Sequence, residues 1–62
     1  MAKILVIDDE ELVRLTVRQA LEAVGHTVVE ASNGRIGVAA FAQHTPDLVI
    51  TDLIMPEQEG IE

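Results

Sequence analysis

Hydrophobic residues gather in short runs that are separated by longer, periodic segments. Residues 3–7 consist of a lysine and a continuous apolar run, Ile4-Leu5-Val6-Ile7, and two acids follow; this is typical of a strand covered on both faces of a parallel sheet. Residues 27–31 are rich in β-branched side chains and residues 48–51 form another apolar run, so both predict strands as well. For residues 3–7 a buried helix segment is the alternative, but five residues are too few for one.

Residues 9–24 carry the spacing of an amphipathic helix. Apolar side chains recur every three or four positions, and polar side chains fill the other side. Asp8 or Asp9 can cap the start of this helix, and Gly25 follows its last apolar position, where a left-handed C-terminal cap is expected. Two ion pairs are expected on its outer face: Glu10 with Arg14, and Arg18 with Glu22.

Residues 35–43 predict a second helix, with Ser32 or Asn33 placed to cap it. Its apolar face is broad, and Phe41, the only aromatic residue of the chain, is expected in the core. Gly37 should weaken this helix by about 1 kcal/mol relative to alanine, unless close packing requires a glycine there.

The resulting order, β-α-β-α-β, predicts an α/β fold with a parallel sheet and right-handed crossovers. The strand at residues 3–7 is the most uniformly apolar, so we place it at the centre, which gives the strand order 2-1-3. Its carboxyl end and that of residues 48–51 would then flank a topological switch point, where ligands of such folds bind.

Three aspartates are expected to meet at that switch point. Asp8 and Asp9 follow the first strand, and Asp52 follows the third. Carboxylates brought this close repel one another, and a hard divalent cation such as Mg²⁺, which prefers oxygen ligands, resolves the conflict. A carboxylate that is not needed as a ligand can act as a nucleophile and form an acyl phosphate, and Asp52 is the better candidate. The simpler interpretation is that Asp8 and Asp9 only cap a helix.

Eleven acidic and four basic residues give the chain a net charge of −7. This balance disfavours nucleic acid binding, which requires clusters of lysine and arginine to meet phosphates. No apolar run approaches the roughly 18 residues of a membrane span, and the start does not resemble a signal peptide. A cytoplasmic location is therefore expected. His26 and His44 have no second metal ligand nearby and are expected as surface or capping histidines.

Two acidic segments, a turn and a closing glycine carry a family resemblance. They are Lys-Ile-Leu-Val-Ile-Asp-Asp-Glu at residues 3–10, Ala-Ser-Asn-Gly at 31–34, Pro-Asp-Leu-Val-Ile-Thr-Asp-Leu-Ile-Met-Pro at 46–56, and Gly60. Together they resemble the receiver domains of two-component response regulators, which have a flavodoxin-like fold. The resemblance extends over residues 1–62.

The resemblance implies a phosphorelay function. A sensor histidine kinase would transfer a phosphoryl group from its phosphohistidine to Asp52, and the chain would be a signalling phosphoacceptor rather than an enzyme. The implied ligands of Mg²⁺ are Asp9 directly, Asp8 through water, Asp52, and the backbone carbonyl of Ile54. Hydrolase chemistry on a phosphate is disfavoured, because no basic group is available to bind the substrate.

The sequence departs from the receiver pattern in two respects. Gln58 stands where many receivers have methionine, and the chain stops at Glu62, before a third helix. The rest of a receiver carries a threonine or serine and a lysine that bind the phosphoryl oxygens, and Lys3 begins a strand at the wrong end of the sheet to replace that lysine. Residues 1–62 are therefore expected to be the N-terminal half of a receiver domain.

Such a half-domain would leave its third strand as an open edge beside bare apolar surface, so self-association as a homodimer is expected. The alternative to a phosphoacceptor is thus an inactive, self-associating α/β half-domain.

Overall fold

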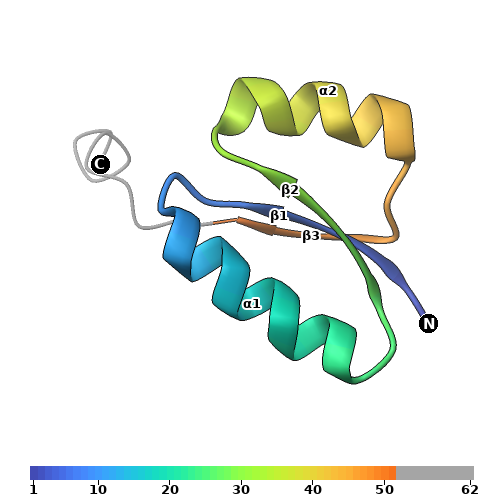
Figure 1. The fold of residues 1–62 in the computed structure, drawn as a ribbon. Helices are drawn as coiled ribbons and strands as arrows, with labels where there is room; N and C mark the ends of the chain where they lie inside the picture. Colours follow the sequence, from blue (N-terminus) through green and yellow to red (C-terminus); the bar gives the residue numbers. More distant parts are fainter. Residues whose placement is uncertain (52–62) are drawn as a thin grey trace, which may run out of the picture.

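Residues 1–51, the part of the chain that the computed structural model describes, form two helices and three strands (Figure 1). The elements are β1 (Lys3–Ile7), α1 (Glu11–Ala23), β2 (Thr27–Ala31), α2 (Gly34–His44) and β3 (Leu48–Thr51). This order confirms the predicted β-α-β-α-β pattern, and the strands occupy the residues that their sequence patterns predicted. Neither of the two described helices has the length and apolar character needed to cross a membrane.

β1 lies at the centre of a parallel sheet with the strand order β2-β1-β3, so the predicted order is confirmed. Ile7, its last residue, pairs with Ala31 on one side and with Thr51 on the other. Leu5 and Val6 in the middle of β1 are 1% and 2% exposed. A strand that is paired on both edges and covered on both faces must be apolar where it is buried, which explains the run at residues 4–7 after Lys3.

The two helices lie on opposite faces of the sheet, as Figure 1 shows, and both pack against β1 and β2. Successive side chains of a strand point to opposite faces. Leu5 therefore belongs to the core beneath α2, with Ala31 and Ala40, whereas Val6 points toward α1 and lies near Val13.

β3 is covered far less than β1. Within residues 1–51 neither helix packs against it, and Leu48 is 53% exposed and Val49 37% exposed although both are apolar. Because consecutive strand residues point to opposite faces, β3 presents apolar surface on both sides of the sheet. Its edge away from β1 has no strand partner in this part of the chain.

Gly37 allows α2 to approach the sheet closely. It is buried, and a Cβ atom added to it would lie 2.5 Å from Cδ1 and 3.0 Å from Cγ1 of Ile7. Carbon atoms that are not bonded prefer a separation of about 3.5 to 4.0 Å, so a side chain at this position would require Ile7 to move. Close packing against Ile7 therefore favours glycine at this position, which is the condition that the sequence prediction left open.

The cap predicted for α2 and the C-terminal turn predicted for α1 are both confirmed. Oδ1 of Asn33 accepts a hydrogen bond from the backbone N–H of Ile36 at 2.9 Å, so Asn33 rather than Ser32 caps α2. Gly25, which follows α1, has a φ angle of +96°, a conformation that glycine adopts without steric cost.

The prediction that Phe41 lies in the core is wrong, because its side chain is 50% exposed. α2 buries Gly37 and Ala40 instead, and residues three apart lie on the same face of a helix. The part of α2 that lies against the sheet is thus formed by small residues, and half of the Phe41 surface remains outside this contact.

We expect Gly37→Ala to destabilise the chain by roughly 1 kcal/mol, because overpacking costs about 1 to 3 kcal/mol and the better helix propensity of alanine offsets about 1 kcal/mol. Urea unfolding followed by circular dichroism measures this change.

The matched control is the same substitution in an Ile7→Ala background, where the crowded atoms are absent. There Gly37→Ala should stabilise the chain by up to about 1 kcal/mol. An equal effect in both backgrounds would show that contact with Ile7 is not the reason for the glycine.

Candidate functional site

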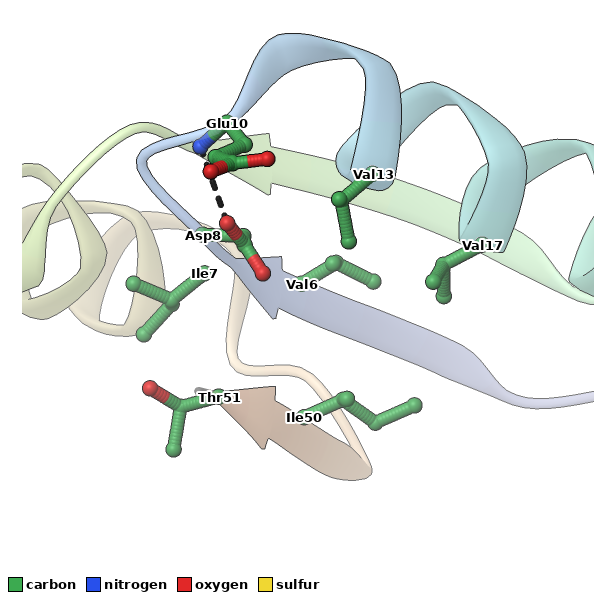
Figure 2. Close-up of a pocket in the computed structure, with 8 residues that line it drawn as sticks. All are labelled: Val6, Ile7, Asp8, Glu10, Val13, Val17, Ile50 and Thr51. Carbon is green, nitrogen blue, oxygen red and sulfur yellow. Dashed lines mark hydrogen bonds between the residues drawn. The ribbon is translucent and has the colours of Figure 1, made fainter. Parts of the chain in front are cut away.

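The carboxyl ends of β1 and β3 lie side by side at one edge of the sheet. Ile7 and Thr51 are partners in the parallel register, and the chain continues from Ile7 directly into Asp8 and Asp9. Asp8 is half-buried and Asp9 is exposed. Figure 2 shows Asp8 at the end of β1 with Thr51 on the neighbouring strand. Two of the three predicted carboxylates therefore lie at the predicted edge.

Three hydrogen bonds fix Asp8 in place. Its backbone N–H donates to the carbonyl oxygen of Ala31 at 3.1 Å, which continues the pairing of β1 with β2 beyond the end of the strand. Its carbonyl oxygen accepts from Nη1 of Arg14 at 2.7 Å. Its carboxylate oxygen Oδ1 accepts from the backbone N–H of Glu10 at 2.8 Å, the bond drawn in Figure 2. Within residues 1–51 the only hydrogen bond to the Asp8 side chain uses Oδ1. Oδ2 can therefore serve as a ligand to a cation.

The predicted helix cap at Asp8 or Asp9 is wrong. α1 begins at Glu11, later than predicted, and its N-cap residue is Glu10, whose side chain makes no cap hydrogen bond. Asp8 instead closes a turn ahead of the helix through its bond to the Glu10 amide, as aspartate often does two residues before a backbone N–H. Helix capping therefore does not account for the two acids.

An open groove of about 380 Å³ lies beside Asp8, between α1 and the β1–β3 side of the sheet (Figure 2). Most of its lining is apolar, and the acidic side chains stand at one end. The lining residues are Val6, Ile7, Asp8, Glu10, Val13, Val17, Ile50 and Thr51. The polar side chains that line this groove, Asp8, Glu10 and Thr51, all lie at the end where β1 and β3 finish.

Glu30 of β2 links α1 to the edge of the sheet. Its Oε1 lies 3.1 Å from Nε of Arg14, and its Oε2 lies 2.7 Å from Nη1 of Arg18. The predicted pair of Arg18 with Glu22 is confirmed, at 2.9 Å. The predicted pair of Arg14 with Glu10 is wrong, because the Arg14 side chain reaches across to Glu30 and to the Asp8 carbonyl instead.

The charges of this network reinforce one another. Hydrogen bonds from Arg18 and then from Arg14 hold the pKa of Glu30 below its usual value. In return, the hydrogen bonds to Glu30 and Glu22 raise the pKa of Arg18. Because its pKa is lowered, Glu30 is ionised at neutral pH and binds both arginines.

The sequence prediction missed Glu30, although a single acid in the otherwise uncharged strand Thr27–Ala31 was a usable signal.

The remaining predicted site residues lie outside the described part of the chain. These are Asp52, predicted as phosphoacceptor, and Ile54, predicted as a carbonyl ligand; Gln58 and Gly60 lie there too. Among residues 1–51, histidine, aspartate and glutamate side chains form no group of three or more that could hold a metal ion. The cluster of three aspartates therefore stays a prediction.

The two histidines lie toward the opposite end of the sheet from Asp8. Nδ1 of His26 accepts a hydrogen bond from the backbone N–H of Ala2 at 3.0 Å. His44 stands in the last turn of α2, and its carbonyl oxygen accepts from Nζ of Lys3 at 3.2 Å. Lys3 begins β1, so it stands at the amino end of the sheet, as predicted.

A family model described as the response regulator receiver domain matches residues 4–62. The chain belongs to this family. The receiver domain of response regulators has a flavodoxin-like fold, and the parallel order β2-β1-β3 with alternating helices agrees with the amino-terminal part of that fold. The family resemblance expected from the acidic segments is thus confirmed.

Curated relatives include response regulators from several organisms. The chain is 40% identical over 62 residues to the protein PilH of Pseudomonas aeruginosa, a match that covers 100% of this chain and 51% of that protein. It is 42% identical over 60 residues to the chemotaxis protein CheY of Bacillus subtilis, covering 95% of this chain and 50% of that protein. The chain therefore spans about half the length of these relatives.

A third relative carries an enzyme name. The chain is 47% identical over 58 residues to a protein-glutamate methylesterase/protein-glutamine glutaminase of Natronomonas pharaonis, covering 92% of this chain but 16% of that protein. Because the match covers so little of the relative, its enzyme name does not transfer to this chain.

Proposed function

We propose that this chain accepts a phosphoryl group on Asp52 in a two-component phosphorelay. The observation that carries the proposal is the pairing of Ile7 with Thr51 at the edge where Asp8 lies. Asp52 follows Thr51 in the sequence as Asp8 follows Ile7. Consecutive Cα atoms lie about 3.8 Å apart and neighbouring strands about 4.8 Å apart, which limits how far Asp52 can stand from the acidic turn.

The residues at this edge fit a magnesium ion. Oδ2 of Asp8 is not used by its side-chain hydrogen bond, and the carboxylate of Asp9 is exposed; both are hard oxygen ligands of the kind that Mg²⁺ prefers. The proposed ligands are Asp9, Asp8 through water, Asp52 and the backbone carbonyl of Ile54. When bound, Mg²⁺ would neutralise charge on the carboxylates and on the phosphoryl oxygens.

The proposed partner is a sensor histidine kinase that carries a phosphohistidine. A carboxylate oxygen of Asp52 forms a bond to phosphorus while the N–P bond of the phosphohistidine breaks. The electron pair of that bond stays on the imidazole nitrogen, which takes up a proton. Asp52 is thus the acceptor of a signal rather than a catalyst of turnover, and the expected location for such a relay is the cytoplasm.

Incubation with acetyl phosphate and Mg²⁺ should add the mass of one phosphoryl group to the wild-type chain and leave Asp52→Asn unmodified, because Asp52 is the proposed acceptor and an asparagine amide does not form an acyl phosphate. Intact-mass spectrometry measures the added phosphoryl mass. Removal of Mg²⁺ with a chelator should abolish this mass gain.

Asp47→Asn is the matched control, since Asp47 precedes β3 at the other end of that strand and asparagine can still accept the hydrogen bond from the Lys3 amide. This variant should be modified like the wild type. A phosphoryl gain on Asp52→Asn equal to that of the wild type would refute the proposed acceptor.

β3 favours a second candidate function, that of a self-associating α/β domain without phosphotransfer. Leu48 and Val49 expose apolar side chains on both faces of this strand, and within residues 1–51 its outer edge has no partner strand. Such edges pair readily with another chain, and self-complementary contacts in soluble proteins most often form symmetric dimers. We therefore propose a homodimer with β3 at its interface.

Analytical ultracentrifugation should detect this dimer at micromolar concentration, and Val49→Lys should weaken it by about tenfold or more, because a lysine on an edge strand opposes pairing. Val38→Lys is the control, since Val38 is 72% exposed on α2, away from β3. A monomer throughout this concentration range, or equal weakening by both variants, would count against the dimer.

A further inference from the structure

Arg14 connects the acidic turn, which we define as Asp8, Asp9 and Glu10, to strand β2. Its side chain is only 15% exposed. Nε donates to Oε1 of Glu30 at 3.1 Å, and Nη1 donates to the carbonyl oxygen of Asp8 at 2.7 Å. Since these nitrogens belong to one planar guanidinium, the orientation of the group is fixed at both ends.

Arg14 contacts the acidic turn at both its first and its last residue. Besides the side-chain bond to the Asp8 carbonyl, its own backbone N–H donates to the carbonyl oxygen of Glu10 at 3.0 Å. The Asp8 carbonyl belongs to the planar peptide that joins Asp8 to Asp9. A hydrogen bond on this oxygen therefore fixes the direction in which the chain continues to Asp9.

We propose that Arg14 is a positioning residue that holds the acidic turn in the orientation in which Asp8 and Asp9 receive a divalent cation. The proposal rests on the proposed function, in which Mg²⁺ binds at this turn. Glu30 acts behind Arg14, because its carboxylate accepts a hydrogen bond from Nε and so orients the guanidinium.

The direction of the change in Mg²⁺ affinity on removal of the Arg14 guanidinium distinguishes a positioning role from a purely electrostatic one. A guanidinium close to a cation site repels the cation, so its removal should tighten Mg²⁺ binding if Arg14 acted only through its charge. Removal of a positioning residue should weaken Mg²⁺ binding.

Arg18 provides the matched control. It lies on α1, carries the same charge and pairs with the same Glu30 carboxylate, but its hydrogen bonds go to Glu30 and Glu22 and not to the acidic turn. Its side chain is 43% exposed. Substitution of Arg18 therefore disturbs the same network without touching Asp8.

Calorimetric titration with Mg²⁺ should show affinity about tenfold weaker for Arg14→Gln, a typical loss when a group that orients metal ligands is removed, and a change of less than about twofold for Arg18→Gln. Arg14→Lys keeps the charge but has one nitrogen for two acceptors, so it should also weaken binding. Unchanged or tighter binding by Arg14→Gln would overturn the proposal.

Hydrogen exchange without metal gives a second readout that does not depend on the proposed function. The Glu10 amide donates to Asp8 Oδ1, and the Ile36 amide donates to Asn33 Oδ1 as an internal reference far from Arg14 in the sequence. Arg14→Gln should speed exchange at Glu10 relative to Ile36, and Arg18→Gln should leave that ratio unchanged.

The two measurements separate the two claims. An unchanged exchange ratio in Arg14→Gln would show that Arg14 does not fix the turn and would overturn the inference. Absence of Mg²⁺ binding by the wild type would contradict the cation role in the proposed function, and the exchange ratio would still decide whether Arg14 holds the turn.

Discussion

The parallel pairing of β1 with both of its neighbours is the constraint on which the rest of the structure depends. β1 lies between β2 and β3, and the helices that follow β1 and β2 cover opposite faces of the sheet, so β1 must be apolar on both faces where it is covered. The same arrangement brings the carboxyl ends of β1 and β3 to one edge. The place of the acidic turn beside the carboxyl end of β3 therefore depends on the strand order as well as on the local sequence.

The two helices are attached to the sheet by different means. α2 approaches closely through Gly37 and Ala40, which are buried. α1 has no fully buried residue and leaves an open groove beside the sheet, so the polar links from Arg14 and Arg18 to Glu30 contribute to its attachment. Because Arg14 also bonds to the Asp8 carbonyl, the contact that anchors α1 also restrains the acidic turn.

The central place of β1 was predictable because burial on both faces leaves an unbroken apolar run at residues 4–7, and short β-branched or apolar segments were enough to identify β2 and β3. Side-chain partners across elements were not predictable in the same way. The helical spacing of α1 identifies neighbours along the helix, but the partner of Arg14 is Glu30, on another element, and depends on how α1 lies over β2. Phe41 was misplaced for a related reason, because the spacing of apolar residues along α2 does not show that Gly37 and Ala40, rather than the aromatic ring, are its buried residues.

We propose above that the acidic turn and the residue after β3 share one cation site. Titration of the ¹⁵N-labelled chain with Mn²⁺, whose unpaired electrons broaden nearby NMR signals, tests it directly. The amide signals of Asp9 and Asp52 should broaden together at low Mn²⁺, while those of Lys3 and Asp47 at the other end of the sheet stay sharp. Broadening of Asp9 with a sharp Asp52 signal would contradict the account.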